Sequence, residues 1–117
     1  MAESEFEYPA AIAALPDADI PLPGVRGKLL QAEGRQVVFF DIEPIGAIPP
    51  HRHAAQFGVV LDGEMSLTIA GATRRYRRGD SYFIPAGVEH SAVFHTRVRV
   101  IDLFDEPARY RPRGREV

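Results

Sequence analysis

The chain has 117 residues, which suits one compact domain and leaves no room for a second. Its formal net charge is −2, with 14 basic and 16 acidic residues, so the composition excludes a general attraction to nucleic acid or to an anionic membrane. The absence of cysteine excludes disulfides and thiolate metal sites, so any metal must be bound by imidazole, carboxylate or amide groups.

The N-terminal segment, residues 1–24, is predicted to be an arm rather than part of the core. It begins with acidic residues where a signal peptide would be basic, and no stretch of the sequence is apolar over a membrane-spanning length. We therefore expect a soluble, cytoplasmic protein. Prolines divide the arm into pieces too short for a long helix. Ala10–Leu15 is compatible with one helical turn after Pro9 and equally with an extended arm.

From Val25 onward the pattern alternates between short strands and turns. Asp62-Gly63 suits a tight hairpin. Such spacing, without a long helical period, predicts an antiparallel sandwich or barrel over residues 25–108. Residues 109–117 are predicted to be a basic tail, frayed beyond Pro112. The expected strands are Lys28–Ala32, Gln36–Glu43, Phe57–Leu61, Glu64–Ile69, Arg74–Arg77, Tyr82–Ile84, His90–Phe94 and Val98–Phe104.

His51 and His53 are the first candidate metal ligands. They are two residues apart, so in an extended segment both imidazoles point to the same face. Two imidazoles on one face form half of a transition-metal site. By itself the pair is equally compatible with partly exposed histidines that follow the rigid Pro49-Pro50 segment.

Two longer stretches give these histidines a context. The first is Gly46-x4-His51-x-His53-x2-Gln56-x6-Gly63, and the second is Gly79-x5-Pro85-x-Gly87-x2-His90. In order and spacing they resemble the two sequence motifs of the cupin superfamily. The resemblance implies an all-β, double-stranded β-helix barrel of the jelly-roll type. It also implies one divalent transition metal ion, held by His51, His53, Gln56 and His90. An empty pocket is the alternative.

The spacing between His53 and Gln56 departs from the motif. Only Ala54 and Ala55 separate the two residues, and an odd separation places Gln56 on the opposite face unless the strand bulges or turns. Counted back from Gly63, however, Gln56 stands where the motif has its glutamate ligand. We therefore expect a shortened corner at Ala54-Ala55 with Gln56 still facing the metal.

Glutamine in place of glutamate changes the expected chemistry. Three neutral imidazoles and an amide leave the full charge of the ion in place, which favours an anionic ligand and polarisation of a carbonyl. This favours Lewis-acid chemistry over a dioxygenase reaction. The donor set does not select between Zn, Mn, Fe and Ni.

Asp102 is the candidate acid in the last expected strand. It shares one face with Val98, Val100 and Phe104, and a carboxylate among apolar neighbours is costly to bury unless it is paired. Such groups often have raised pKa values and catalytic roles, although a structural Asp bonded to a loop or an Arg fits equally well. For Tyr82, strand parity leaves open whether the ring lines the cavity or the outer wall.

A narrower resemblance involves the C-terminal residues. Asp102-x-Phe104, followed by Pro107 and Arg109, resembles the small cupins of pectin and alginate degradation, which convert 4,5-unsaturated monouronates to linear ketouronates. This resemblance implies that Asp102 is catalytic and that Phe104 and Arg109 bind the substrate. Phe94 stands where the second motif often ends in Asn and is expected to line the same pocket.

The leading hypothesis is a metal-dependent, non-oxidative enzyme of the isomerase, tautomerase or lyase type. It would act on a small sugar acid or keto compound, with Asp102 as the proton shuttle and Arg109 as the partner of a substrate carboxylate. A non-catalytic barrel that binds a small anionic molecule is the second hypothesis, and an Fe(II) dioxygenase is the third. The family resemblance also implies a homodimer, with the arm reaching across to the partner subunit. Neither nucleic acid nor a membrane is an expected partner.

Overall fold

The computed structural model of the protein describes residues 5–44 and 47–114. Gly46 of the first motif and both ends of the chain, residues 1–4 and 115–117, lie outside the described residues. No helix in the described part of the chain is long and apolar enough to cross a membrane. The elements are α1 (Ala10–Ala13), β1 (Val25–Ala32), β2 (Arg35–Ile42), β3 (Ala47–His51), β4 (Gln56–Asp62), β5 (Glu64–Ile69), β6 (Ala72–Arg77), β7 (Ser81–Ile84), β8 (His90–Phe94) and β9 (Val98–Phe104).

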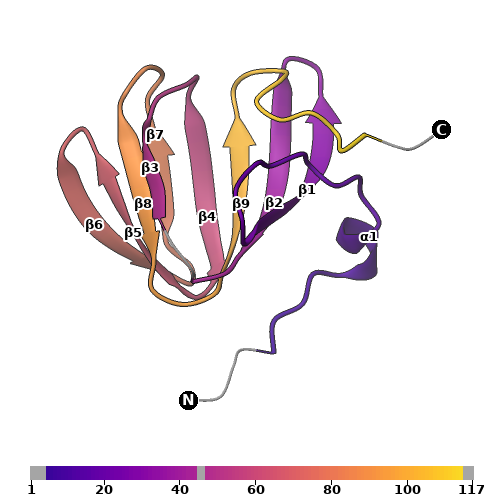
Figure 1. Ribbon diagram of the computed structural model, residues 1–117, viewed down its shortest axis with the longest axis horizontal. Coiled ribbons are helices and arrows are strands. Elements are labelled where there is room, and N and C mark those ends of the chain that lie inside the picture. The colour runs from indigo at the N-terminus through magenta and orange to yellow at the C-terminus, as the bar shows by residue number, and fades with distance from the viewer. Residues whose placement is uncertain (1–4, 45–46, 115–117) are drawn as a thin grey trace.

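The strands form two antiparallel sheets. One has the order β1-β2-β9-β4-β7 and the other β3-β8-β5-β6. Figure 1 shows β6, β5 and β8 of the second sheet on the left of the view and β9, β2 and β1 of the first on the right. This arrangement confirms the predicted all-β jelly roll, and α1, a single turn, is one of the two forms expected for Ala10–Leu15.

The core lies between the sheets. Every second side chain along a strand points into it, so apolar residues at those positions form the core. In β2 the inward residues Val38, Phe40 and Ile42 are buried, and β9 buries Val100 and Phe104 in the same way. Burying apolar surface at about 25 cal/mol per Å² is the main stabilising contribution. The predicted inward face of β9 is therefore confirmed.

The hairpin between β4 and β5 is tighter than expected. Gly63 alone separates the two strands and has φ of +90°, where a side chain is strained. A Cβ at this position would also overlap the carbonyl oxygen of Arg97. The prediction of a turn at Asp62-Gly63 holds, but within this turn only Gly63 takes a positive φ.

The segment that follows α1 is joined to the C-terminal segment, in a contact here called the terminal clasp. The Asp19 N–H donates to the Arg111 carbonyl at 2.8 Å, and the Arg113 N–H donates to the Asp17 carbonyl at 2.8 Å. Ala18 pairs with Pro112 between these bonds and is buried. The expected fraying beyond Pro112 is therefore wrong for Arg113. Contact of the arm with a partner subunit stays a prediction.

The outer face of the five-stranded sheet carries two distinct rows of residues across its strands. The first, here called the apolar row, joins side chains that are directly opposite one another in successive strands. The second, here called the charged row, consists of side chains whose charges alternate between positive and negative from strand to strand. The apolar row is Leu30, Val37, Leu103, Phe57 and Phe83, and the charged row is Arg26, Asp41, Arg99 and Asp62.

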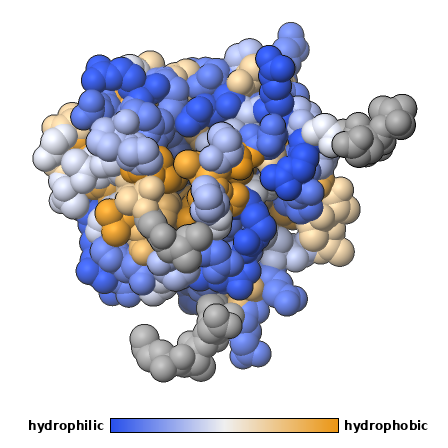
Figure 2. All heavy atoms as spheres, in the orientation of Figure 1, coloured by the Kyte–Doolittle hydropathy of each residue, from blue (hydrophilic) through white to orange (hydrophobic). Residues whose placement is uncertain are grey.

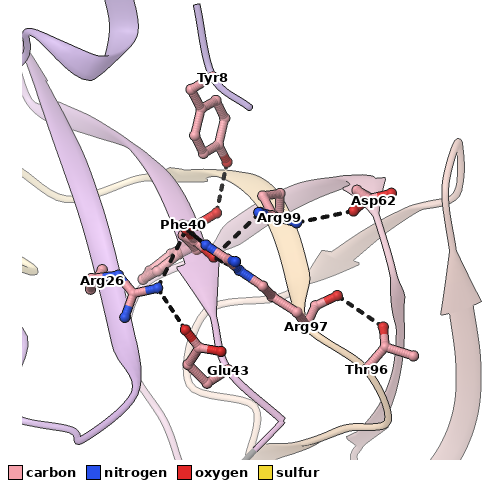
Figure 3. A network of polar contacts seen from close by, with 9 residues as sticks. Tyr8, Arg26, Phe40, Glu43, Asp62, Thr96, Arg97 and Arg99 are labelled. Carbon is pink, nitrogen blue, oxygen red and sulfur yellow. Dashed lines mark hydrogen bonds and ion pairs between the residues drawn. The ribbon is translucent and has the colours of Figure 1, made fainter. Parts of the chain in front are cut away.

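The charged row is held together by ion pairs and covered by the N-terminal segment. Arg99 is buried and contacts Asp41 at 3.3 Å and Asp62 at 3.2 Å. The Arg97 guanidinium donates to both carboxylate oxygens of Asp41, at 2.9 and 2.7 Å. Tyr8 donates its hydroxyl hydrogen to the Phe40 carbonyl at 2.7 Å, as Figure 3 shows together with these arginines.

Candidate metal centre

Three histidines meet where β3 and β8 pair. His51 lies opposite His90 in this pairing, after a register shift between Ile48 and His51. Pro49 and Pro50 occupy the shifted positions, because proline has no N–H for the ladder. His53 follows in the corner before β4, and the ligand atoms of the three histidines all lie within 4.8 Å of one another.

Backbone carbonyl groups orient each of these imidazoles. A carbonyl oxygen only accepts, so each Nδ1 that contacts one must carry the proton, which leaves Nε2 with a free lone pair. Two of these nitrogens, His53 Nε2 and His90 Nε2, are 3.1 Å apart. The Nδ1 contacts are His51 to Pro49 at 2.9 Å, His53 to Ala54 at 2.8 Å and His90 to Val88 at 3.0 Å.

The local electrostatics keep His53 and His90 neutral, the form that binds metal. Burial, with smaller contributions from the charges of Arg109, His90 and His51, lowers the pKa of His53 to about 4 against an opposing hydrogen bond to Ala54. Burial also lowers the pKa of His90. His53 and His90 therefore offer uncharged nitrogens that converge with those of His51 on a site for a divalent transition metal.

The corner between His53 and Gln56 is short, and backbone contacts fix it from both sides. Gly87 of the second motif donates its N–H to the His53 carbonyl at 2.8 Å, and Asp105 donates to the Ala55 carbonyl at 2.9 Å. The Ala54 N–H donates to the Glu106 carboxylate at 3.2 Å. This explains how the chain turns within two residues.

Gln56 begins β4 and lines the same cavity as the histidines. It shares the inward face of β4 with Gly58 and Val60, both buried. Its Oε1 atom is buried and has no hydrogen-bond partner among the described residues. An unsatisfied buried oxygen is costly, and a cation beside it would remove that cost. The donor set therefore fits a metal ion, while the role of Gln56 as a ligand stays a prediction.

Asp102 lies on the wall of the cavity and is tied to Tyr82. The Tyr82 hydroxyl donates to Asp102 Oδ1 at 2.7 Å, from β7 across β4 to β9. Gly58 stands between them, and a Cβ there would overlap both side chains. Burial raises the pKa of Asp102 to about 7, while hydrogen bonds from Tyr82 and Gln56 act in the opposite direction. Tyr82, whose orientation the sequence left open, therefore faces inward.

The cavity next to the histidines has a volume of about 320 Å³ and is largely apolar. Phe94, Phe104 and Arg109 all line it, and their role in binding a substrate stays a prediction. The Arg109 guanidinium lies over the Tyr110 ring at 4.9 Å, and its Nε is buried without a partner among the residues described. Figure 2 shows apolar surface at the centre of this view, between the two sheets. The arrangement suits a small molecule with one anionic end.

Several residues of the site were missed by sequence reasoning. Ile20 and Leu22 of the arm line the cavity of their own chain, and Tyr110 packs edge-on against Phe104 at 5.7 Å between ring centroids. Glu106 braces the corner through Ala54. The apolar residues between the prolines of the arm were the available signal for Ile20 and Leu22. Nothing in the sequence pattern distinguished Glu106.

Comparisons with known proteins agree with this geometry. The family described as a cupin domain matches residues 38–104, more than half of the chain. Among solved structures, KdgF from Halomonas sp. is 29% identical with a TM-score of 0.69, covering 80% of this chain and 87% of that chain. An RmlC-like cupin from Shewanella frigidimarina NCIMB 400 is 25% identical with a TM-score of 0.73, covering 92% and 94%.

More distant similarity supports the fold alone. Oxalate decarboxylase from Bacillus subtilis is 18% identical with a TM-score of 0.68, covering 83% of this chain and 29% of that chain. A search of curated proteins found no match. The family match over the paired strands, together with three converging histidines from both motifs, leads to one conclusion. The chain belongs to the cupin family.

Proposed function

We propose that this cupin is a divalent-metal-dependent, non-oxidative enzyme of the isomerase, tautomerase or lyase type, acting on a small sugar acid or keto compound. One observation carries the proposal: a single cavity combines three converging imidazoles, the buried carboxyl group of Asp102 and the Arg109 guanidinium. The 4,5-unsaturated uronates are the substrates that we favour. The sequence resemblance to cupins of pectin and alginate degradation supports this choice, as does the similarity to KdgF.

The metal would be held by His51, His53, Gln56 and His90. When bound, a divalent transition metal supplies a Lewis acid that polarises a substrate oxygen. Zn, Mn, Fe and Ni are all compatible with imidazole and amide donors. The uncharged ligands leave its positive charge to attract an anionic substrate.

The remaining residues would orient the substrate and move its protons. Arg109 pairs with the substrate carboxylate, since a guanidinium matches a carboxylate with two parallel hydrogen bonds. Phe94 and Phe104 supply apolar walls that keep water from the ring of the sugar. Asp102 lines the same cavity, two residues before Phe104 on the inward face of β9, where it can accept a proton and return it.

A ring-opening isomerisation needs only these parts. The proton leaves the anomeric hydroxyl, and the bond between the anomeric carbon and the ring oxygen breaks. The anomeric carbon becomes an aldehyde and the ring oxygen leaves as an enolate, which takes the proton from Asp102 at its vinyl carbon and becomes a ketone. Atoms balance without a co-reactant, because the proton that Asp102 accepts is equivalent to the one that it returns.

The test is turnover of an unsaturated monouronate, followed as loss of its absorbance and identified as the keto product by NMR. Asp102→Asn, assayed at saturating metal, should reduce turnover on the order of a hundredfold, because it keeps the size of the side chain and removes the proton carrier. If wild type and Asp102→Asn are equally inert on uronates and keto sugars while a small anion still binds, a non-catalytic binding barrel is the function. Oxygen uptake with Fe(II) would instead indicate a dioxygenase.

We also infer that the protein's macromolecular partner is a second copy of itself. Phe57 and Phe83 lie opposite each other on the outer face and are 43% and 58% exposed, and Leu30 at the other end of the apolar row is 45% exposed. A row that spans one sheet can pair with itself about a two-fold axis. The cytoplasmic location and the absence of nucleic-acid binding stay predictions.

A further inference from the structure

The wall of the cavity contains a chain of contacts that extends outward from the metal centre. It begins at Gln56, which lies diagonally across from Asp102 on the inward face, because Gln56 is opposite Phe104 and Gly58 is opposite Asp102. Hydrogen bonding by the Gln56 side chain acts to lower the pKa of Asp102. The contacts continue to Tyr82, whose hydroxyl donates to Asp102 Oδ1 at 2.7 Å. Asp102 and Tyr82 are both buried, with 3% and 5% of their surface exposed, so water does not compete for the bond between them. The three side chains are therefore neighbours on one inward face.

The first contact determines which way the amide of Gln56 faces. An amide has a donor end and an acceptor end, whereas a carboxylate only accepts. Since Oε1 has no hydrogen-bond partner among the described residues, the NH₂ group is the end of Gln56 that faces Asp102. That oxygen is the buried atom without a partner, and it belongs to a side chain that lines the cavity of His51, His53 and His90. Asp102 thus selects the amide orientation that offers oxygen to a metal.

The second contact depends on Gly58. Tyr82 and Asp102 lie on the strands that flank β4, and each is directly opposite Gly58 in its pairing. With any larger residue at position 58, a Cβ would fill the space through which the Tyr82 hydroxyl reaches Asp102. The bond holds one carboxylate oxygen in place and so fixes the carboxylate that Gln56 contacts.

We propose that Tyr82 and Asp102 are positioning residues that hold Gln56 in the orientation of a metal ligand. The proposal deepens the proposed function, since it rests on the metal centre described there. It also gives a reason for glutamine at position 56. A glutamate would place a second carboxylate against Asp102, whereas the amide offers Asp102 a donor and the metal an acceptor.

The test is a double-mutant cycle on metal affinity, measured by titrating the metal-free protein with Co(II) or Mn(II) and no substrate. Tyr82→Phe should weaken binding by about tenfold, as the loss of an outer-shell partner typically does. Gln56→Ala should weaken binding at least as much. Because Tyr82 acts through Gln56, adding Tyr82→Phe to Gln56→Ala should cause no further loss. The Co(II) absorption bands of Tyr82→Phe should shift toward those of Gln56→Ala.

A control separates this effect from a general loss of packing. Tyr76 is a second buried tyrosine whose ring packs edge-on against Tyr82, with 5.5 Å between ring centroids. Tyr76→Phe removes a hydroxyl from the same core and should leave the Co(II) affinity and spectrum unchanged.

Two outcomes would overturn the positioning role. One is a Tyr82→Phe protein that binds Co(II) as wild type does. The other is the same tenfold loss in the Gln56→Ala background, which would mean that Tyr82 acts independently of Gln56. Neither outcome depends on turnover. An inactive wild-type protein that shows the expected cycle supports the positioning role and contradicts the proposed enzyme.

Discussion

At the scale of single residues, the orientation of the three imidazoles is set by hydrogen bonds from Nδ1 to backbone carbonyl groups. Removal of one ligand should leave two nitrogens, too few to hold a metal tightly. We expect His51→Ala and His90→Ala each to lose stoichiometric metal and the thermal stabilisation that metal gives, because a ligand of the native state raises stability by mass action. Elemental analysis of protein purified without a metal-affinity column, with melting curves, measures both.

A matched control is available on the outer surface. His95 is exposed and contacts Ser66 Oγ at 2.7 Å through Nε2. His95→Ala should keep its metal and its response to chelator. A wild-type protein without metal, whose melting temperature ignores both added Mn or Zn and chelator, would contradict the metal centre itself.

The sequence allowed the histidines of this site to be predicted, but not the orientations of Tyr82 and Gln56. The His51 and His90 pair followed from motif spacing, because the spacing of a motif reflects the strand register that unites its residues. The inward direction of Tyr82 did not follow, since parity along one short strand does not say which face is inward. The amide orientation of Gln56 depends on Asp102, which is distant in sequence, and no local pattern encodes it.

At the scale of elements, the charged row links four strands of one sheet and should make stability depend on pH. Burial acts to raise the pKa of Asp41, but the hydrogen bond and charge of Arg97, with the charges of Arg99 and Arg26, hold it below its usual value. A carboxyl group with a lowered folded pKa contributes stability above its unfolded pKa of about 4. That contribution is lost as pH falls through the folded value.

Asp41→Asn should therefore destabilise the protein by roughly 2 kcal/mol near neutral pH, because it leaves the buried Arg99 with Asp62 alone as its carboxylate partner in the charged row. The difference from wild type should shrink as the pH is lowered toward the folded pKa of Asp41. Urea unfolding at a series of pH values measures it. A difference that stays constant down to strongly acidic pH would show that the loss comes from packing rather than from charge.

Most strands were predictable from alternation, and β3 shows the limit of that method. Its sequence contains Pro49-Pro50, which weakens any strand assignment because proline lacks a ladder donor. The structure accommodates the prolines at a register shift, and the pairing of His51 with His90 follows from it. A bulge at the edge of a sheet is determined by its partner strand, so the sequence of β3 by itself does not predict it.

At the scale of the whole molecule, the apolar row predicts how two copies meet. We expect a homodimer by light scattering, and Phe57→Asp or Phe83→Asp should convert it to a monomer, because a buried unpaired carboxylate is costly. Val93 is an apolar residue on the other sheet with similar exposure, 48%. Val93→Asp should leave the dimer intact. Dimerisation that survives both Phe variants, or fails in Val93→Asp, would assign the interface to another face.

The terminal clasp bears on the order in which the molecule folds. Hairpins such as β5 with β6 close short loops, whereas the clasp joins Asp17 to Arg113 and must close a loop almost as long as the chain, at a higher entropic cost. We therefore expect the sheets to form early and the mouth of the pocket, beside Arg109, to close late. The same clasp should open by local fluctuation while the sheets persist, so the Asp19 and Arg113 amides should exchange with solvent deuterium before those of β4. Entry to the cavity would then be controlled by opening of the terminal clasp, while the two sheets stay folded.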